Sequence, residues 1–217
     1  VPRVHDEFSY LLAADTFAAG RAANPTHPLW RHFETMHVIH EPSYASKYPP
    51  GQGFLLAMGQ VLFGLPMAGV WLSSALGVVA GYYLLRGFVI QRWAVVGAAL
   101  LLLQPGFQLV WGQSYWGGTL AFAGGGLLLG AAKRLLAGPM LSHAAIAAVG
   151  ATLLAVTRPF EGLVVCMCAA AWILCSWHRT GWPDLRDVAL KLVLPQAAIF
   201  VVGAVVLAGY NAAVTGS

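Results

Sequence analysis

Four long stretches of this chain contain no Asp, Glu, Lys or Arg, and they limit its fold more than any other feature. They cover residues 48–85, 93–132, 135–157 and 192–217. A helix needs about 20 apolar residues to cross the roughly 30 Å hydrocarbon layer of a bilayer, and every stretch is long enough. Only 9% of all residues are charged, against about 25% in a typical soluble domain. The sequence therefore predicts an integral membrane protein.

These stretches favour helices, because barrel strands would alternate polar and apolar residues over about ten positions between turns. We predict an all-α, polytopic bundle of about six spans, at residues 66–86, 94–111, 117–137, 142–157, 160–177 and 188–210. The apolar segment 51–64 is short and Pro66 follows it, so we expect a re-entrant or juxtamembrane helix there. Residues 1–50 would form a polar outer loop with a juxtamembrane helix, and residues 51–217 the bundle.

The basic residues predict an orientation. If segment 51–64 does not cross the membrane, one side receives Arg86, Arg92, Lys133, Arg134, Arg179, Arg186 and Lys191. The positive-inside rule makes that side cytoplasmic. The outer loop and the turns at 113–118 and 157–162 then meet on the periplasmic face of the cytoplasmic membrane. If segment 51–64 crossed the membrane, these basic residues would lie outside and the rule would be broken. The sequence therefore favours a segment 51–64 that does not cross.

Both ends of the sequence suggest a truncated chain. It begins with Val1 on a polar loop that has no membrane anchor before it, and it ends at Ser217 just past an apolar helix. We expect further segments on both sides.

Small residues inside the apolar stretches predict helix packing. The glycine-rich stretches 77–81 and 124–130 have spacings that let helices approach closely, and no strand precedes them as in a nucleotide-binding loop. Cys166, Cys168 and Cys175 lie in one apolar stretch without metal-site partners, so we expect them to be packing residues.

Most of the potential chemistry lies in the first 41 residues. They hold five of the eight acidic residues and five of the seven histidines. Residues 5–15 predict an interfacial helix with Phe8, Leu11 and Leu12 on its apolar side, whereas Asp6 and Tyr10 share a different face. Acidic residues at a helix start also interact favourably with the helix dipole, so a purely structural role stays open.

The order of motifs in residues 5–60 resembles a known family. Asp6-Glu7, Tyr10, an alanine-rich helix and an aromatic-rich loop precede Lys47-Tyr48-Pro49-Pro50-Gly51 and an apolar helix. This order resembles the first outer loop of C-type (GT-C) membrane glycosyltransferases, above all the protein O-mannosyltransferases and the lipid A aminoarabinose transferases. The resemblance implies a polyprenyl-phosphate-linked sugar donor in the membrane lipids and an acceptor glycan, lipid or protein.

The resemblance also implies roles for single residues. Asp6 would be the catalytic base toward the acceptor hydroxyl, with Glu7 beside it in the catalytic pair, and Lys47 would neutralise the leaving phosphate. This agrees with the chemistry, because displacing a phosphate from an anomeric carbon needs a base and a fixed positive charge. Tyr10 and Tyr48 are also predicted to bind the substrate. Aromatic residues in this loop are suited as well to anchor the protein at the membrane interface.

Arg158 and Glu161 are the other predicted substrate-binding residues. They are the only charged residues between Arg134 and Arg179, and they flank Pro159 at a break between two apolar helices. Ionisable residues at such depth are functional candidates, and Arg158 could be a second phosphate contact. The alternative is a structural ion pair between the two side chains.

One departure limits the resemblance, and a metal site is a further alternative. The aminoarabinose transferases have a further acid on the outer side where this chain has Tyr115-Trp116-Gly117-Gly118, which leaves their substrate and a two-acid site in doubt. A divalent metal is a minor alternative, because the spacing of its possible donors fits no standard motif. Those donors are His32, Glu34, His37, His40 and Glu41. We therefore predict no cofactor.

Other classes of protein remain as alternatives. A transporter or lipid flippase would line a pathway with Arg158, Glu161 and the glycine-rich helices, and a non-enzymatic assembly subunit would keep the fold without the activity. The net charge of +4 does not predict nucleic-acid binding, because no basic run exists and membrane orientation explains the basic loops.

Overall fold

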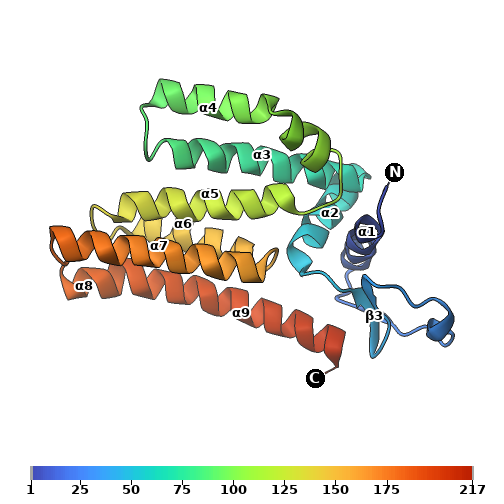
Figure 1. Ribbon diagram of the computed structural model, residues 1–217. Coiled ribbons are helices and arrows are strands. Elements are labelled where there is room, and N and C mark those ends of the chain that lie inside the picture. Colours follow the sequence, from blue (N-terminus) through green and yellow to red (C-terminus); the bar gives the residue numbers. More distant parts are fainter. Residues whose placement is uncertain (1, 217) are drawn as a thin grey trace.

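The computed structural model describes residues 2–216. Figure 1 shows long helices lying side by side in a bundle, with the N-terminal segment and a short transverse helix at one end. We call residues 2–63, which include that transverse helix, the cap. The molecule is mostly helical, as the sequence predicts.

Each predicted span contains helix, but the predicted span 94–111 is interrupted at Gln104, where the backbone is extended. The bundle contains α3 (Pro66–Leu85), α4 (Gln91–Leu103), α5 (Gly118–Leu135), α6 (Leu141–Ala155), α7 (Pro159–Thr180) and α9 (Leu194–Thr215). The π-helical turn η2 (Gly106–Trp111) follows α4, and α8 (Leu185–Asp187) and η3 (Val188–Val193) lead into α9.

Among the described residues 2–216, three helices are long and apolar enough, by length and composition, to cross a membrane. They are Pro66–Leu85, Pro159–Thr180 and the continuous stretch Leu185–Thr215. The apolar helices α4 and α6 are shorter. The structure thus supports membrane association through a small set of spans.

Close backbone contacts hold the bundle together. Helix α5 packs against α3, α6 and α7. A Cβ atom on Gly150 of α6 would lie 2.6 Å from the carbonyl oxygen of Gly124 of α5, so only glycine fits. This confirms the predicted packing role of the glycine-rich stretch. Cys166 packs against the core, but Cys168 and Cys175 are exposed on α7, so the packing prediction was wrong for those two.

The transverse helix is α2 (Pro50–Phe63), which ends at Gly64 with a positive φ of 74°. It lies across one end of the bundle rather than along it (Figure 1). The connections α3–α4, α5–α6 and α7–α8 lie together at the opposite end (Figure 1), and the basic residues that follow the cap, apart from Arg158, lie in them or in the helical segments beside them. This arrangement separates the basic connections from the cap by the length of the bundle.

The cap contains a small sheet that we did not predict. Strands β1 (Asn24–Pro25), β2 (Val38–Ile39) and β3 (Ser43–Ser46) form an antiparallel sheet in the order β1-β3-β2, and the 3₁₀ turn η1 (Trp30–His32) lies between β1 and β2. Such short strands lack the alternating pattern by which strands are recognised. Ser43 Oγ donates to the Val214 carbonyl at 2.7 Å and fastens the sheet to α9.

The first helix of the cap is α1 (His5–Ala18). It packs on α2 through Tyr10, Ala13 and Ala14, and a Cβ on Gly53 would lie 2.6 Å from the Ala13 Cβ. Phe8, on the predicted apolar side, remains 58% exposed. The small residues therefore decide which side of α1 is buried.

Candidate functional site

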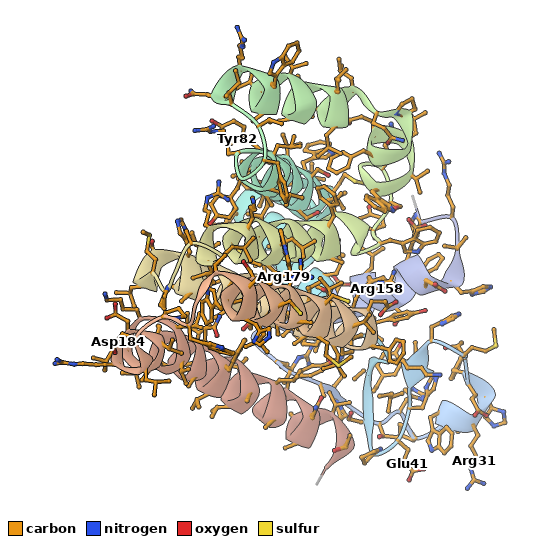
Figure 2. The ribbon with its side chains drawn as sticks, turned by 60° about the vertical axis from the view of Figure 1, so that its left-hand side comes forward. Arg31, Glu41, Tyr82, Arg158, Arg179 and Asp184 are labelled. Carbon is orange, nitrogen blue, oxygen red and sulfur yellow. The ribbon has the colours of Figure 1, made fainter. Side chains whose placement is uncertain are left out.

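An open cavity of about 440 Å³ lies where the cap meets the bundle. Four segments line it: α1, the residues just before α2, the turn before α5, and the junction of α6 and α7. Its walls contain Asp6, Tyr10, Tyr48, Pro49, Trp116, Thr157, Arg158, Pro159, Phe160 and Glu161. Figure 2 shows Arg158 beside the cap and Asp184 at the far end of the bundle. The structure therefore brings five of the seven predicted site residues into one cavity.

Asp6 enters this cavity from the first turn of α1, one helical turn before Tyr10. Its carboxylate oxygen Oδ1 lies 3.0 Å from His37 Nε2. The other ring nitrogen of His37, Nδ1, lies 2.8 Å from the Tyr48 hydroxyl. The His37 ring thus lies between the Asp6 carboxylate and the Tyr48 hydroxyl, in polar contact with both.

The register of the β2–β3 hairpin explains how His37 reaches Asp6. Val38 pairs with Ser46, so the residue before Val38 lies opposite the residue after Ser46. The Lys47 amide accordingly donates to the His37 carbonyl at 3.2 Å. Ser9 Oγ of α1 donates to the same carbonyl at 2.6 Å and lies 2.8 Å from Ser46 Oγ. Helix α1 is thereby fixed to the hairpin beside Asp6.

Tyr10 and Tyr48 form one wall of the cavity. Their rings stack with centroids 4.6 Å apart and planes at 12°. Burial, and then the nearby Asp6 carboxylate, raise the pKa of the Tyr48 phenol to about 12. Burial also raises the pKa of Tyr10, against the opposing effect of the Arg158 charge. Both hydroxyl groups therefore stay protonated near neutral pH, and each hydroxyl oxygen can accept a hydrogen bond from a ligand.

Arg158 reaches the cavity because α2 is fastened to the end of α6. The Gly51 amide donates to the Val156 carbonyl at 2.9 Å, and Pro159 then begins α7. Arg158 Nη1 lies 3.7 Å from Glu161 Oε1, with side chains 50% and 60% exposed. An ion pair this exposed contributes about 0–1 kcal/mol. The guanidinium can therefore exchange Glu161 for an anionic ligand, and it is the only cation among the lining residues.

Glu7 is not among the residues that line this cavity. Its side chain is buried, and its Oε2 accepts from the amides of Arg3 at 2.5 Å and Val4 at 3.3 Å. Its Oε1 accepts from the Tyr115 amide at 3.0 Å. The carboxylate therefore caps α1 and fastens it to the turn before α5, which is a structural role that needs the whole fold to be recognised.

Lys47 lies in an adjoining cavity of about 350 Å³. Its side chain is exposed, and this second cavity shares Tyr48, Pro49 and Pro159 with the first. The predicted phosphate contact is thus next to the Asp6 cavity rather than inside it.

A third cavity, of about 450 Å³, is almost wholly apolar. It shares Pro50 and Tyr210 with the Lys47 cavity, and it lies between α2, α3, α5, α6 and α9. Its walls include Phe54, Leu76, Leu153 and Val206. The three cavities therefore form a series from a polar pocket to an apolar groove in the bundle.

The histidine-rich segment does not gather into a metal site. Within residues 2–216, no three His, Cys, Asp or Glu side chains are placed to hold a metal ion together. His40 instead accepts from the Thr35 amide at 3.3 Å and stacks on Trp30. From the sequence we considered His37 only as a metal donor, and no spacing indicated its contact with Asp6.

The first cavity offers two carboxylates, two phenols and a guanidinium at one end of the helical bundle. Such a set can accept a proton, bind hydroxyl groups and neutralise an anion. Searches against protein families, curated proteins and solved structures found no match to this chain.

Proposed function

We propose that this protein is a C-type membrane glycosyltransferase, which moves a sugar from a polyprenyl-phosphate donor to an acceptor hydroxyl. The observation that carries the proposal is the shared cavity of Asp6 and Arg158, two residues far apart in the sequence. The transfer needs a base on one side of the reacting carbon and positive charge where the phosphate departs. Both are available in that cavity.

Each step of the transfer has a residue to serve it. Asp6 accepts the proton of the acceptor hydroxyl as the acceptor oxygen forms its bond to the anomeric carbon. The bond from that carbon to the phosphate oxygen breaks, and its electron pair leaves with the phosphate. Arg158 stabilises the departing charge from within the cavity, and Lys47 does so from the adjoining one. Tyr10 and Tyr48 hold the sugar hydroxyls.

The apolar third cavity supports a lipid-linked donor. A polyprenyl tail that lies between α2 and α9 keeps its carbon chain in an apolar environment while its phosphate reaches the Lys47 cavity. In this proposal α4, α5 and α6 cross the membrane with the three longer spans. The cap lies on the periplasmic face of the cytoplasmic membrane, because the basic connections lie at the opposite end of the bundle.

Asp6→Asn in the intact protein tests this function, with Asp15→Asn as its matched control. Asp15 lies in the same helix and is exposed, and its Oδ1 accepts from Gln60 Nε2 at 2.9 Å. We expect Asp6→Asn to insert and fold but to lose about 10²–10⁴-fold in sugar transfer, whereas Asp15→Asn stays active. Full activity of Asp6→Asn would exclude Asp6 as the base. Substrate flux in proteoliposomes without covalent transfer would instead identify a transporter.

A further inference from the structure

His37 occupies a position between Asp6 and Tyr48 that the proposed transfer does not yet explain. We propose that His37 is a positioning residue, which holds one oxygen of the Asp6 carboxylate so that the other remains available to the acceptor hydroxyl. This inference rests on the proposed function, because Asp6 is the base there. His37 is not among the residues that line the Asp6 cavity, so it acts through Asp6.

The position of His37 is fixed at three atoms. Its carbonyl oxygen accepts from Ser9 Oγ and from the Lys47 amide. Its Nε2 contacts Asp6 and its Nδ1 contacts Tyr48. The imidazole therefore has little freedom to turn away from the carboxylate. Asp6, in contrast, is partly exposed, and His37 is the only ion-pair partner found for it in the described residues.

The partners assign a direction to each hydrogen bond. An ionised carboxylate has no hydrogen to donate, so His37 Nε2 carries the hydrogen that bonds to Asp6 Oδ1. In the neutral imidazole Nδ1 is then an acceptor, and the Tyr48 hydroxyl donates to it. A protonated Tyr48 thus selects the imidazole form that supports Asp6.

This arrangement sets the geometry of the base. Oδ1 is occupied by the imidazole N–H, and Oδ2 is the oxygen that can take a proton from an acceptor. Without His37, the partly exposed Asp6 side chain loses its ion-pair partner. A misplacement of about 1 Å can reduce an enzymatic rate by about 10²-fold. The expected loss is therefore in the chemical step rather than in donor binding.

Steady-state kinetics of His37→Ala, His37→Gln and His32→Ala test the proposal. We expect His37→Ala to lower kcat by roughly tenfold to hundredfold with an unchanged KM for the lipid-linked donor. His37→Gln should recover part of kcat, because its amide N–H can donate to Asp6. His32 is exposed in the same loop, so His32→Ala should resemble the parent protein. Equal losses in both His37 variants, accompanied by a raised KM, would overturn the proposal in favour of a structural role.

Nitrogen NMR of histidine-labelled protein in nanodiscs gives a readout that does not depend on activity. The His37 signals are identified by their loss in His37→Gln. We expect a hydrogen on Nε2 and none on Nδ1, with the Nε2 signal shifted by Asp6→Ala and the Nδ1 signal by Tyr48→Phe. A hydrogen on Nδ1, or signals unaffected by Asp6→Ala, would refute the bond to Asp6. A parent protein that transfers no sugar would refute the proposed function instead.

Discussion

Gly51→Ala tests whether the contact between α2 and the end of α6 sets the shape of the cavity. A Cβ at this position would lie 2.8 Å from both Thr157 Cγ2 and the Val156 carbonyl oxygen. Non-bonded heavy atoms normally approach to about 3.5–4.0 Å. The two segments must therefore separate by roughly 1 Å, which stretches the 2.9 Å hydrogen bond from Gly51 to Val156. Tyr48 lies three residues before Gly51 and Arg158 lies two residues after Val156, so both cavity residues are close to this contact along the chain.

Two opposing effects set the change in the free energy of unfolding that Gly51→Ala causes. Overpacking costs about 1–3 kcal/mol, whereas replacing a helical glycine by alanine gains up to about 1 kcal/mol. Gly125 in α5 is a matched control, because a Cβ there would meet no atom within 4 Å. Gly51→Ala should thus be less stable than Gly125→Ala by about 1–3 kcal/mol.

Thermal unfolding in detergent and sugar transfer measure the two consequences. We expect a lower Tm for Gly51→Ala than for Gly125→Ala, together with a loss of activity of about 10²-fold from the displaced Arg158. If both glycine variants have the same Tm and the same activity, the contact does not set the cavity.

Four further predictions follow from single side chains. Glu7→Ala should lower the free energy of unfolding by on the order of 2–3 kcal/mol, because three partly buried amide groups lose a charged acceptor; chemical denaturation measures it. Arg158→Ala should raise the donor KM roughly tenfold to hundredfold, with partial recovery in Arg158→Lys. Val206→Trp should weaken binding of long-chain donors but not of short-chain analogues, as competition assays would detect. The phenol of Tyr48 should ionise near pH 12, visible as the absorbance difference from Tyr48→Phe. The pKa of Tyr48 in the folded protein lies above the ordinary value of 10.0. The protonated phenol therefore contributes fully to folding stability below pH 10, and this contribution is lost as the pH rises through about 12.

Local sequence patterns predicted the positions of the helices and the polar character of the cap. A stretch without charged residues leaves a backbone few ways to satisfy its polar groups in lipid except as helix, so α3, α6 and α7 lie close to their predicted positions. The spacing of Asp6 and Tyr10 likewise placed both on one face of α1. The break at Pro159 indicated that Arg158 lies at a helix junction. Each of these inferences needs only a few neighbouring residues.

The sequence by itself determined a helical fold with apolar helices long enough to cross a membrane, and a polar segment that holds most of the acidic residues and histidines, because hydropathy and helix periodicity are local properties. Tertiary structure alone decided which of those residues meet. The register of β2 and β3 brings His37 to Asp6, the turn before α5 gives Glu7 a structural role, and Lys47 lies in the adjoining cavity. Hydrogen bonds between distant segments depend on position to within a fraction of an ångström, and only the packed chain fixes that position.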